Sequence, residues 1–415
     1  MLDGFDVQSI AFVAPVLIED WDIAAGAFGP IFGAGLFGLM VGQLIFGPLS
    51  DRYGRRPVIL FCTLWFGSLT LATAFASSWN VLLALRFFTG IGLGGAMPNI
   101  IALTSEFSPA KNRATLVTVM FAGFPLGAAI GGLISSQMIP ALGWQSVFYL
   151  GGTVPLLLLI LLFFLLPESA QQLARSGADP SRIRKLLMRV NPGNPPSEDV
   201  DFTIAEKQVE GFSLIALLRR GLATRTLLLW LLYFMSLLMV YFLMSWLPSI
   251  LSQSGMPLDQ AIIGAVALHI GGAIGGVLLG WLCDRHNPFI VLASGFLVAG
   301  GCIAMVGLTF GIPVILMALV FTAGFTIVGG LTATLPIATG IYSSSVRASG
   351  VGAALAVGRI GSIVGPVAGG YLISTQWPAS AMFGVAALPA IVACLTILAL
   401  MLVVARSRTT EPDSP

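Results

Sequence analysis

The chain has 415 residues, of which 57% are hydrophobic and only 9% are charged. An average soluble domain carries about 25% charged residues, so this composition excludes an ordinary soluble protein and favours a protein of the lipid bilayer. The net charge of +2 comes from basic residues dispersed among loops, which gives no reason to expect a nucleic-acid partner. The four cysteines form no CxxC pair, and we therefore predict no metal site, no cofactor and no disulfide framework.

Twelve apolar stretches follow one another, each near the roughly 20 residues that a helix needs to cross a membrane. The first six are expected near residues 1–19, 26–50, 58–78, 81–106, 114–139 and 145–166. Six more are expected near residues 225–251, 259–283, 289–310, 313–340, 348–374 and 379–405. We therefore predict an all-α membrane protein with twelve transmembrane helices, the first of which is short enough to be truncated.

A polar stretch separates the two sets of six helices and indicates the domain organisation. We predict an N-terminal six-helix bundle over 1–166, a cytoplasmic linker over 167–223, a C-terminal six-helix bundle over 224–405 and a disordered cytoplasmic tail over 406–415. The two bundles are expected to be nearly equal in size, with no further domain between them.

The two halves also repeat each other in sequence. Three positions of the second predicted helix and its loop recur at one constant spacing in the second half, where Gly38, Gly42 and Asp51 return as Gly271, Gly275 and Asp284. A repeat with the same direction and an even number of spans is parallel. The two bundles are therefore expected to be related by a pseudo-two-fold axis along the membrane normal.

The distribution of charge predicts the orientation of the chain. Of the 20 Lys and Arg residues, 18 fall in segments that twelve spans place on one side of the membrane. The loops on the opposite side carry carboxylates instead, namely Glu19, Asp20, Asp22 and Asp259. The positive-inside rule then makes both termini cytoplasmic.

Charged residues at the predicted cytoplasmic ends are candidates for a gate. A carboxylate there can accept hydrogen bonds from helix N-terminal amides, and arginines can pair with helix C-termini or with carboxylates. Such groups can hold the cytoplasmic side closed, and plain positive-inside anchoring is the alternative interpretation. The candidate gate residues are Asp51, Arg52, Arg55, Arg56, Glu106, Arg113, Asp284, Arg285 and Arg347.

Two carboxylates lie inside the first apolar segment. Asp3 and Asp6 are three residues apart, so they share one side of a helix. Two carboxylates this close in a poorly solvated cavity do not both ionise readily, which makes them candidates for proton coupling. The alternative is that both are exposed residues of a frayed N-terminus.

Two arginines also lie inside apolar helices, Arg86 and Arg359. A charge at the centre of a bilayer costs roughly 2.5–3.5 kcal/mol on insertion scales, and charges kept there usually line a pathway for an ion or a polar solute. Both are candidates to bind a substrate carboxylate, with a structural salt bridge as the alternative. Tyr233 and Tyr241 are eight residues apart and are candidates to contact an aromatic ring, with lipid-facing packing as the alternative.

Several of these segments together resemble the aromatic acid:proton symporter family of the major facilitator superfamily, and within it the transporters of 4-hydroxybenzoate and protocatechuate. The similar segments are Asp3-Gly4-Phe5-Asp6, Asp51-Arg52-Tyr53-Gly54-Arg55-Arg56, Glu106-Phe107-Ser108-Pro109 and Gly358-Arg359-Ile360-Gly361. The resemblance implies alternating-access import of an aromatic carboxylate, driven by protons across a bacterial inner membrane. It also implies that Asp3, Asp6, Arg86, Glu106, Arg347 and Arg359 occupy functionally important positions.

Two other functions are open to a chain of this kind. One is proton-coupled export of organic acids or drugs by the same fold, and the other is a membrane enzyme or a sensor. No nucleophile–base pair or metal-ligand cluster supports an enzyme, so none is expected. The expected partners are the aromatic carboxylate, protons and the lipid bilayer, and we expect a monomer.

Overall fold

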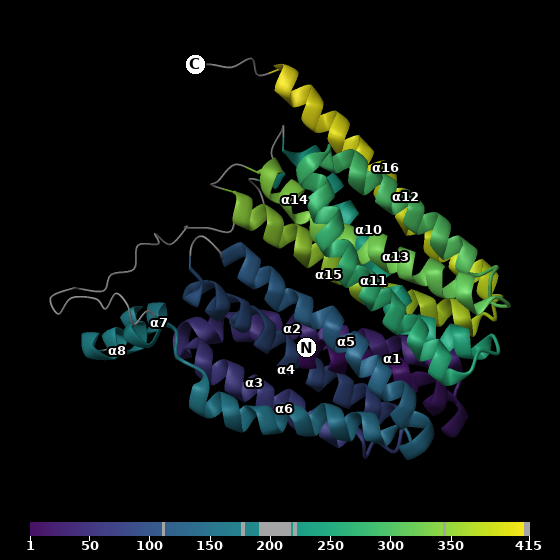
Figure 1. Ribbon diagram of the computed structural model, residues 1–415, viewed down its shortest axis with the longest axis horizontal. Helices are drawn as coiled ribbons and strands as arrows, with labels where there is room; N and C mark the ends of the chain where they lie inside the picture. Colours follow the sequence, from purple (N-terminus) through teal and green to yellow (C-terminus); the bar gives the residue numbers. More distant parts are fainter. Residues whose placement is uncertain (110–112, 176–178, 191–216, 219–221, 343–345, 411–415) are drawn as a thin grey trace.

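The computed structural model of the chain is almost entirely helical, which confirms the predicted all-α class (Figure 1). It describes residues 1–109, 113–175, 179–190, 217–218, 222–342 and 346–410. Most of the predicted linker and the end of the predicted tail therefore lie outside the described residues. Two short helices, α7 (Ala170–Arg175) and α8 (Pro180–Val190), follow the first half of the chain beside the end of its bundle.

The helices of the first half agree with the predicted spans to within a few residues. They are α1 (Leu2–Asp20), α2 (Phe28–Tyr53), α3 (Arg55–Thr73), α4 (Trp79–Phe107), α5 (Arg113–Leu142) and α6 (Gln145–Leu165), with the 3-10 turn η1 (Ala25–Ala27) before α2. Gly54, which separates α2 from α3, has φ +100°, a left-handed conformation that glycine adopts without steric cost.

The second half has the same sequence of long helices. They are α10 (Ala223–Gln253), α11 (Leu258–Arg285), α12 (Pro288–Val306), α13 (Pro313–Ala333), α14 (Leu335–Ile341), α15 (Arg347–Ser374) and α16 (Ala379–Thr410). The span predicted near 313–340 is divided into α13 and α14 because Pro336 has no backbone N–H to continue the helical hydrogen bonds. Residues 406–410, predicted as part of a disordered tail, are helical because α16 meets no Gly or Pro before Pro412.

Eleven helical segments in the described residues are long and apolar enough to cross a membrane. The helix α1 has 19 residues and is not among them, because it carries four carboxylates, two of them in its last turn. It nevertheless packs inside the molecule against α5, α6 and α10, with Phe12, Val13 and Leu17 fully buried. The position of α1 is therefore set by its packing among the other helices.

Glycines let the helix pairs of each half approach closely. A Cβ atom at Gly38 or Gly42 of α2 would collide with a backbone carbonyl of α4. The repeat positions Gly271 and Gly275 of α11 meet backbone carbonyls of α13 in the same way. The repeat read from the sequence is therefore a repeat of packing, in which small residues bring two helix backbones into contact.

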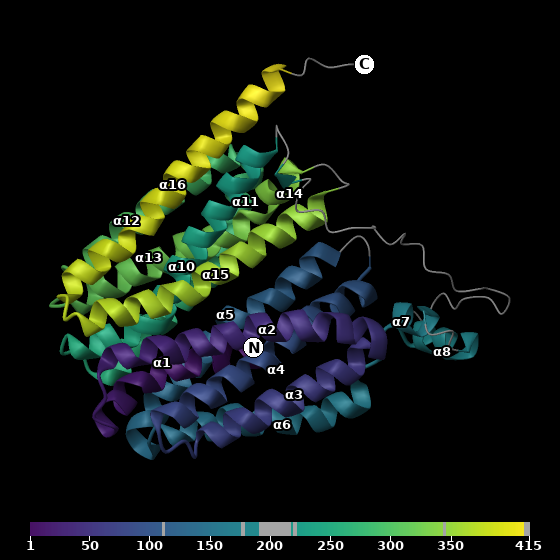
Figure 2. The same ribbon diagram turned by 180° about the vertical axis from the view of Figure 1, so that it is seen from behind.

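The two halves lie side by side as two groups of helices (Figures 1 and 2). They meet where α5 contacts α11, α2 contacts α15 and α1 contacts α10. In α2, Gly29 packs against Gly370 of α15 and Gly33 packs against Val367, and Gly26 of the preceding turn η1 also meets Gly370. Because α2 begins beside the acidic loop that holds Asp22, this contact closes the acidic end of the boundary between the halves.

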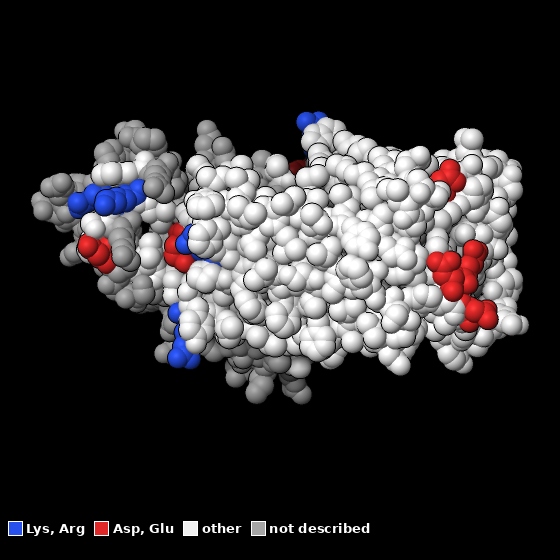
Figure 3. Space-filling model, turned by 90° about the horizontal axis from the view of Figure 1, so that it is seen from below, with Lys and Arg blue, Asp and Glu red and all other residues white. Residues whose placement is uncertain are grey.

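On the face shown in Figure 3, the charged side chains lie toward the two ends of the molecule. One end shows acidic side chains only, and the opposite end shows the Lys and Arg side chains together with a few Asp and Glu, with a band free of charge between the two ends on this face. Large apolar side chains such as Leu44, Phe164 and Val277 are exposed on the sides of the helices. This surface suits lipid, which solvates apolar groups that water would not.

The glycine packing generates a test of stability. Gly38→Ala is expected to destabilise the protein by about 1–3 kcal/mol, because the added methyl group meets the Phe87 carbonyl. Gly47→Ala is the matched control on the same helix, since no atom lies within 4 Å of its added Cβ. Thermal unfolding in detergent measures both, and an equal melting temperature for the two variants would contradict the packing argument.

Candidate functional site

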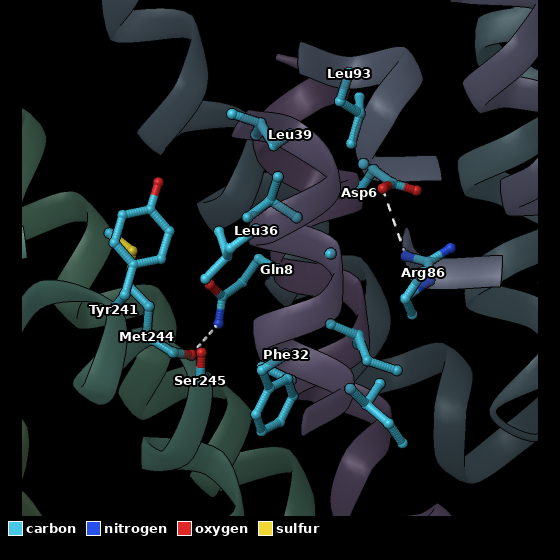
Figure 4. A pocket seen from close by; sticks show the side chains of 16 residues that line it. Asp6, Gln8, Phe32, Leu36, Leu39, Arg86, Leu93, Tyr241, Met244 and Ser245 are labelled. Carbon is cyan, nitrogen blue, oxygen red and sulfur yellow. Dashed lines mark hydrogen bonds and ion pairs between the residues drawn. The ribbon is translucent and has the colours of Figure 1, made fainter. Parts of the chain in front are cut away.

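A small cavity lies where the two halves meet (Figure 4). Its walls come from α1, α2 and α4 of the first half and from α10 of the second half. Its polar lining is provided by Asp6, Gln8, Arg86, Tyr241 and Ser245. The volume is about 40 Å³, which admits a few water molecules, whereas an engineered cavity that binds benzene measures roughly 150 Å³. The cavity as described is therefore too small to hold an aromatic ring.

Asp6 and Arg86 form a buried ion pair in the wall of the cavity. The Asp6 Oδ2 and Arg86 Nη1 atoms are 3.5 Å apart, and the two side chains are only 2% and 4% exposed. Thr70 donates from its Oγ1 to Asp6 Oδ1 at 2.5 Å, and Arg86 Nη2 donates to Thr73 Oγ1 at 2.9 Å. The guanidinium also lies 5.2 Å from the centre of the Phe148 ring. The positive charge of Arg86 is therefore already compensated within the first half.

Arg359 of α15 has a different environment. It is half-buried, and its Nη1 donates to the Tyr241 hydroxyl at 3.3 Å. Among the described residues no carboxylate lies within 4.0 Å of its guanidinium, since the two ion pairs found there are Arg86 with Asp6 and Arg55 with Glu106. A guanidinium without a bonded carboxylate, at the boundary between the halves, is free to pair with an anionic ligand.

Asp3 lies near three other charged groups. Its carboxylate interacts electrostatically with Asp6, with the amino group of Met1 and with Arg359. Its Oδ1 atom is buried and has no hydrogen-bond partner among the described residues. A carboxylate with a buried, unbonded oxygen has room to hold a proton, and here it faces charges from both halves of the molecule.

The two tyrosines predicted as one group are separated by the structure. Tyr241 lines the cavity, whereas Tyr233 does not and packs against Gly358 of α15. Tyr233 is 2% exposed, and its hydroxyl has no partner within the described part of the chain. A spacing of eight residues turns a side chain by about 80° around a helix, enough to direct the two rings to different neighbours.

Gln8 is a site residue that the sequence reasoning missed. It is 2% exposed, lines the cavity, and donates from Nε2 to the backbone carbonyl of Met244 at 2.6 Å. This hydrogen bond joins α1 of the first half to α10 of the second. The signal was a lone amide in an apolar helix, two positions after Asp6.

The candidate gate residues Arg55, Arg56 and Glu106 come together at the basic end of the first half. Glu106 Oε2 accepts from Arg55 Nη1 at 2.6 Å and from Ser169 Oγ at 2.7 Å. The second carboxylate of the cluster, Glu168, accepts from the backbone N–H groups of Arg55 and Arg56, at 3.1 and 3.2 Å. Glu168 was not among the predicted gate residues, and its role in holding the start of α3 follows from these bonds.

The other gate candidates do not join this cluster. Asp51, Arg52, Asp284 and Arg285 are exposed, and the Arg285 guanidinium stacks 4.2 Å from the Trp281 ring. Arg347 is also exposed, and its Nε donates to the Tyr342 carbonyl at 3.4 Å. The Arg113 side chain lies outside the described residues. No described side chain of the gate set bonds across the two halves, so a gate formed by them stays a prediction.

The described residues contain no group of three or more His, Cys, Asp or Glu side chains arranged to hold a metal ion. The chemistry available at the cavity is therefore that of ion pairing, hydrogen bonding and proton binding by carboxylates.

The buried ion pair generates a second prediction. Asp6→Ala leaves Arg86 as a buried charge without a carboxylate, and removing one partner of such a pair costs about 3–5 kcal/mol. We expect a large drop in the temperature of thermal unfolding in detergent. The double variant Asp6→Ala/Arg86→Met is expected to recover most of the loss, and Asp20→Ala, at an exposed carboxylate, to show none. A double variant no more stable than Asp6→Ala would show that the pair does not carry the effect.

Comparison with known proteins identifies the family to which the chain belongs. The family model described as Major Facilitator Superfamily matches residues 1–335 and, in a second match, 229–415. The chain is 40% identical to the gallate transporter of Pseudomonas putida over 400 residues, which are 96% of this chain and 89% of that protein. It is also 40% identical to the 4-hydroxybenzoate transporter PcaK of Pseudomonas aeruginosa over 399 residues, again 96% and 89%.

The fold is also similar to that of a solved transporter. A bacterial homolog of the human lysosomal transporter Spinster, in an inward-facing and occupied conformation, matches with a TM-score of 0.73 at 17% identity. The match covers 100% of this chain and 96% of that chain. The chain is thus a multi-pass membrane protein with a transporter fold rather than an enzyme, and it belongs to the Major Facilitator Superfamily.

Proposed function

We propose that this chain is a proton-coupled secondary transporter that imports an aromatic carboxylate of the 4-hydroxybenzoate or protocatechuate type. The observation that carries the proposal is the environment of Arg359, whose half-buried guanidinium bonds to the Tyr241 hydroxyl and has no carboxylate in bonding range among the described residues. Relatives with 40% identity are named for gallate and for 4-hydroxybenzoate, both hydroxylated benzoates.

The substrate carboxylate pairs with Arg359 in this proposal. A planar guanidinium can donate two parallel hydrogen bonds to a carboxylate, which fixes the orientation of the anion as well as binding it. The ring then extends toward Tyr241 and the apolar side chains of the cavity, such as Phe32 and Leu36. Arg86 acts at a distance, because Asp6 already neutralises it.

Proton coupling is assigned to Asp3 and Asp6. Asp3 is the better placed of the two to exchange a proton, because Asp6 is held by Arg86 and Thr70 whereas Asp3 has a buried oxygen without a partner in the described residues. One proton carried with one monovalent anion moves no net charge. The membrane potential, worth about 2.3 kcal/mol per charge at 100 mV, then contributes nothing, and the pH difference drives uptake.

Transport proceeds by alternating access between two bundles, residues 1–166 and 224–405, with 167–223 as the cytoplasmic linker. The glycine contact between α2 and α15 supports closure at the acidic end in the conformation described, and the charged residues at the basic end do not bridge the halves. We assign the acidic end to the outside of a bacterial inner membrane and the basic end, with both termini, to the cytoplasm. The charged residues at the basic end would form the gate in the opposite conformation.

Substitution of Arg359 tests the substrate site. Arg359→Ala is expected to reduce uptake of labelled 4-hydroxybenzoate by at least about tenfold, because a charge-assisted bidentate contact is lost. Arg359→Lys keeps the charge without the planar fork and is expected to restore uptake only in part. The control Lys185→Ala, at an exposed cation on α8, should transport normally. Normal affinity in a membrane-inserted Arg359→Ala variant would remove Arg359 from the site.

Substitution of Asp3 tests the coupling. In Asp3→Asn vesicles we expect accumulation of substrate on an imposed pH gradient to be lost, while exchange of internal for external substrate continues. Exchange requires only that the site opens alternately to the two sides of the membrane with substrate bound. It requires no net movement of protons. Accumulation that persists in Asp3→Asn, or wild-type uptake that ignores a protonophore, would contradict proton coupling through this residue.

A further inference from the structure

Pro248 leaves a gap in the hydrogen bonds of α10. The helix runs unbroken from Ala223 to Gln253 with this proline inside it. In an α-helix the carbonyl of each residue accepts from the N–H four positions later, and proline has no N–H. The carbonyl of Met244 therefore has no donor at position 248. A buried carbonyl without a partner is unfavourable, so another donor is needed.

The other half of the molecule supplies that donor. Gln8 of α1 donates from Nε2 to the Met244 carbonyl at 2.6 Å, and both residues are buried and line the cavity (Figure 4). The bond is thus part of the cavity wall, and it lies on the boundary between the halves.

Comparison of the two halves of the repeat shows whether the equivalent proline of α1 has a similar hydrogen bond. The spacing that relates Gly38 to Gly271 also relates Pro15 of α1 to Pro248, and Gln8 to Tyr241. Gln8 and Tyr241, two of the polar side chains that line the cavity, therefore occupy equivalent positions of the repeat. The carbonyl that Pro15 leaves free belongs to Ala11, and no side chain of the second half donates to it within the described residues. Of these two equivalent prolines, Pro248 is the one whose free carbonyl accepts a hydrogen bond from the other half among the described residues.

We infer that a hydroxyl group on the ring of the substrate inserts between Gln8 Nε2 and the Met244 carbonyl, and that this pair selects hydroxylated aromatic acids. The inference rests on the proposed function, in which the substrate is an aromatic carboxylate. A phenolic hydroxyl both accepts and donates a hydrogen bond. It accepts from Nε2 and donates to the carbonyl, so that one direct bond is replaced by two and no buried polar group is left without a partner.

An unsubstituted ring cannot make this exchange. A ring C–H that separates Gln8 from Met244 leaves a buried donor and a buried acceptor unpaired, and sites built to bond a hydroxyl reject analogues that lack it for this reason. A methoxy group can accept from Nε2 but has no proton for the carbonyl. Both benzoate and 4-methoxybenzoate are therefore expected to bind at least about tenfold more weakly than 4-hydroxybenzoate.

The test measures this preference in purified protein. Labelled 4-hydroxybenzoate is bound to the full chain in detergent and displaced by unlabelled 4-hydroxybenzoate, benzoate or 4-methoxybenzoate. Two variants remove the hydrogen bond between Gln8 and Met244 in different ways. Gln8→Leu removes the amide, and Pro248→Ala restores an N–H that occupies the Met244 carbonyl within the helix. Pro15→Ala is the matched control for the removal of a proline from the equivalent helix.

We expect the wild type and Pro15→Ala to prefer 4-hydroxybenzoate over benzoate and 4-methoxybenzoate by tenfold or more. In Gln8→Leu and in Pro248→Ala the preference is expected to fall to about threefold or less. Wild-type protein that binds benzoate as tightly as 4-hydroxybenzoate overturns the inference, as does a folded Gln8→Leu or Pro248→Ala variant that keeps the wild-type preference. Wild-type protein with no saturable binding of any of the three acids overturns the proposed function itself.

Discussion

The interior of a lipid bilayer offers no hydrogen-bonding partner, and this constraint determines where each polar group of the protein lies. Backbone groups are satisfied within helices, and the charged side chains that remain in the interior face other protein groups. The helix α1 illustrates the point, because its carboxylates Asp3 and Asp6 are tolerated only where α1 is surrounded by α5, α6 and α10. The pairing of Asp6 with Arg86 compensates one buried charge within the first half, whereas Arg359 keeps a charge that a ligand can use.

Close helix packing is similar in the two halves, whereas the charged residues inside the membrane differ between them. The glycines of α2 and α11 bring the same pairs of helices into contact in both halves. The arginines do not repeat. The contacts of Gly38 with Phe87 and of Gly271 with Phe321 make Val320 the position equivalent to Arg86. The spacing that relates Gly127 to Gly361 makes Pro125 the position equivalent to Arg359. A symmetric framework thus carries an asymmetric set of charges, which suits a solute with a carboxylate at one end and a ring at the other.

The contacts at the two ends of the molecule differ in the conformation described. The halves meet through glycines near the acidic end, where backbones approach without side chains between them, and the central cavity is too small for a ring. At the basic end, Arg55, Glu106 and Glu168 bond to their own half and to the segment that follows it. Opening the acidic end would separate Gln8 from Met244, and the carbonyl that Pro248 leaves free would then need another donor.

Composition, spacing and charge bias were enough to predict the helical class, the approximate spans and the parallel repeat. They also identified the charged residues inside the membrane, although a salt bridge was only the alternative interpretation of the two arginines. These features can be recognised within the sequence of each single helix. A segment that spans lipid must be long and apolar, so a charged residue inside it is easy to identify. The sequence could not show that Tyr241 and not Tyr233 lines the cavity, that Arg86 is neutralised while Arg359 is not, or that Gln8 reaches the carbonyl of Met244. Those outcomes depend on the rotation of each helix and on which neighbour it meets across the boundary, and only the packing of all the helices together decides them.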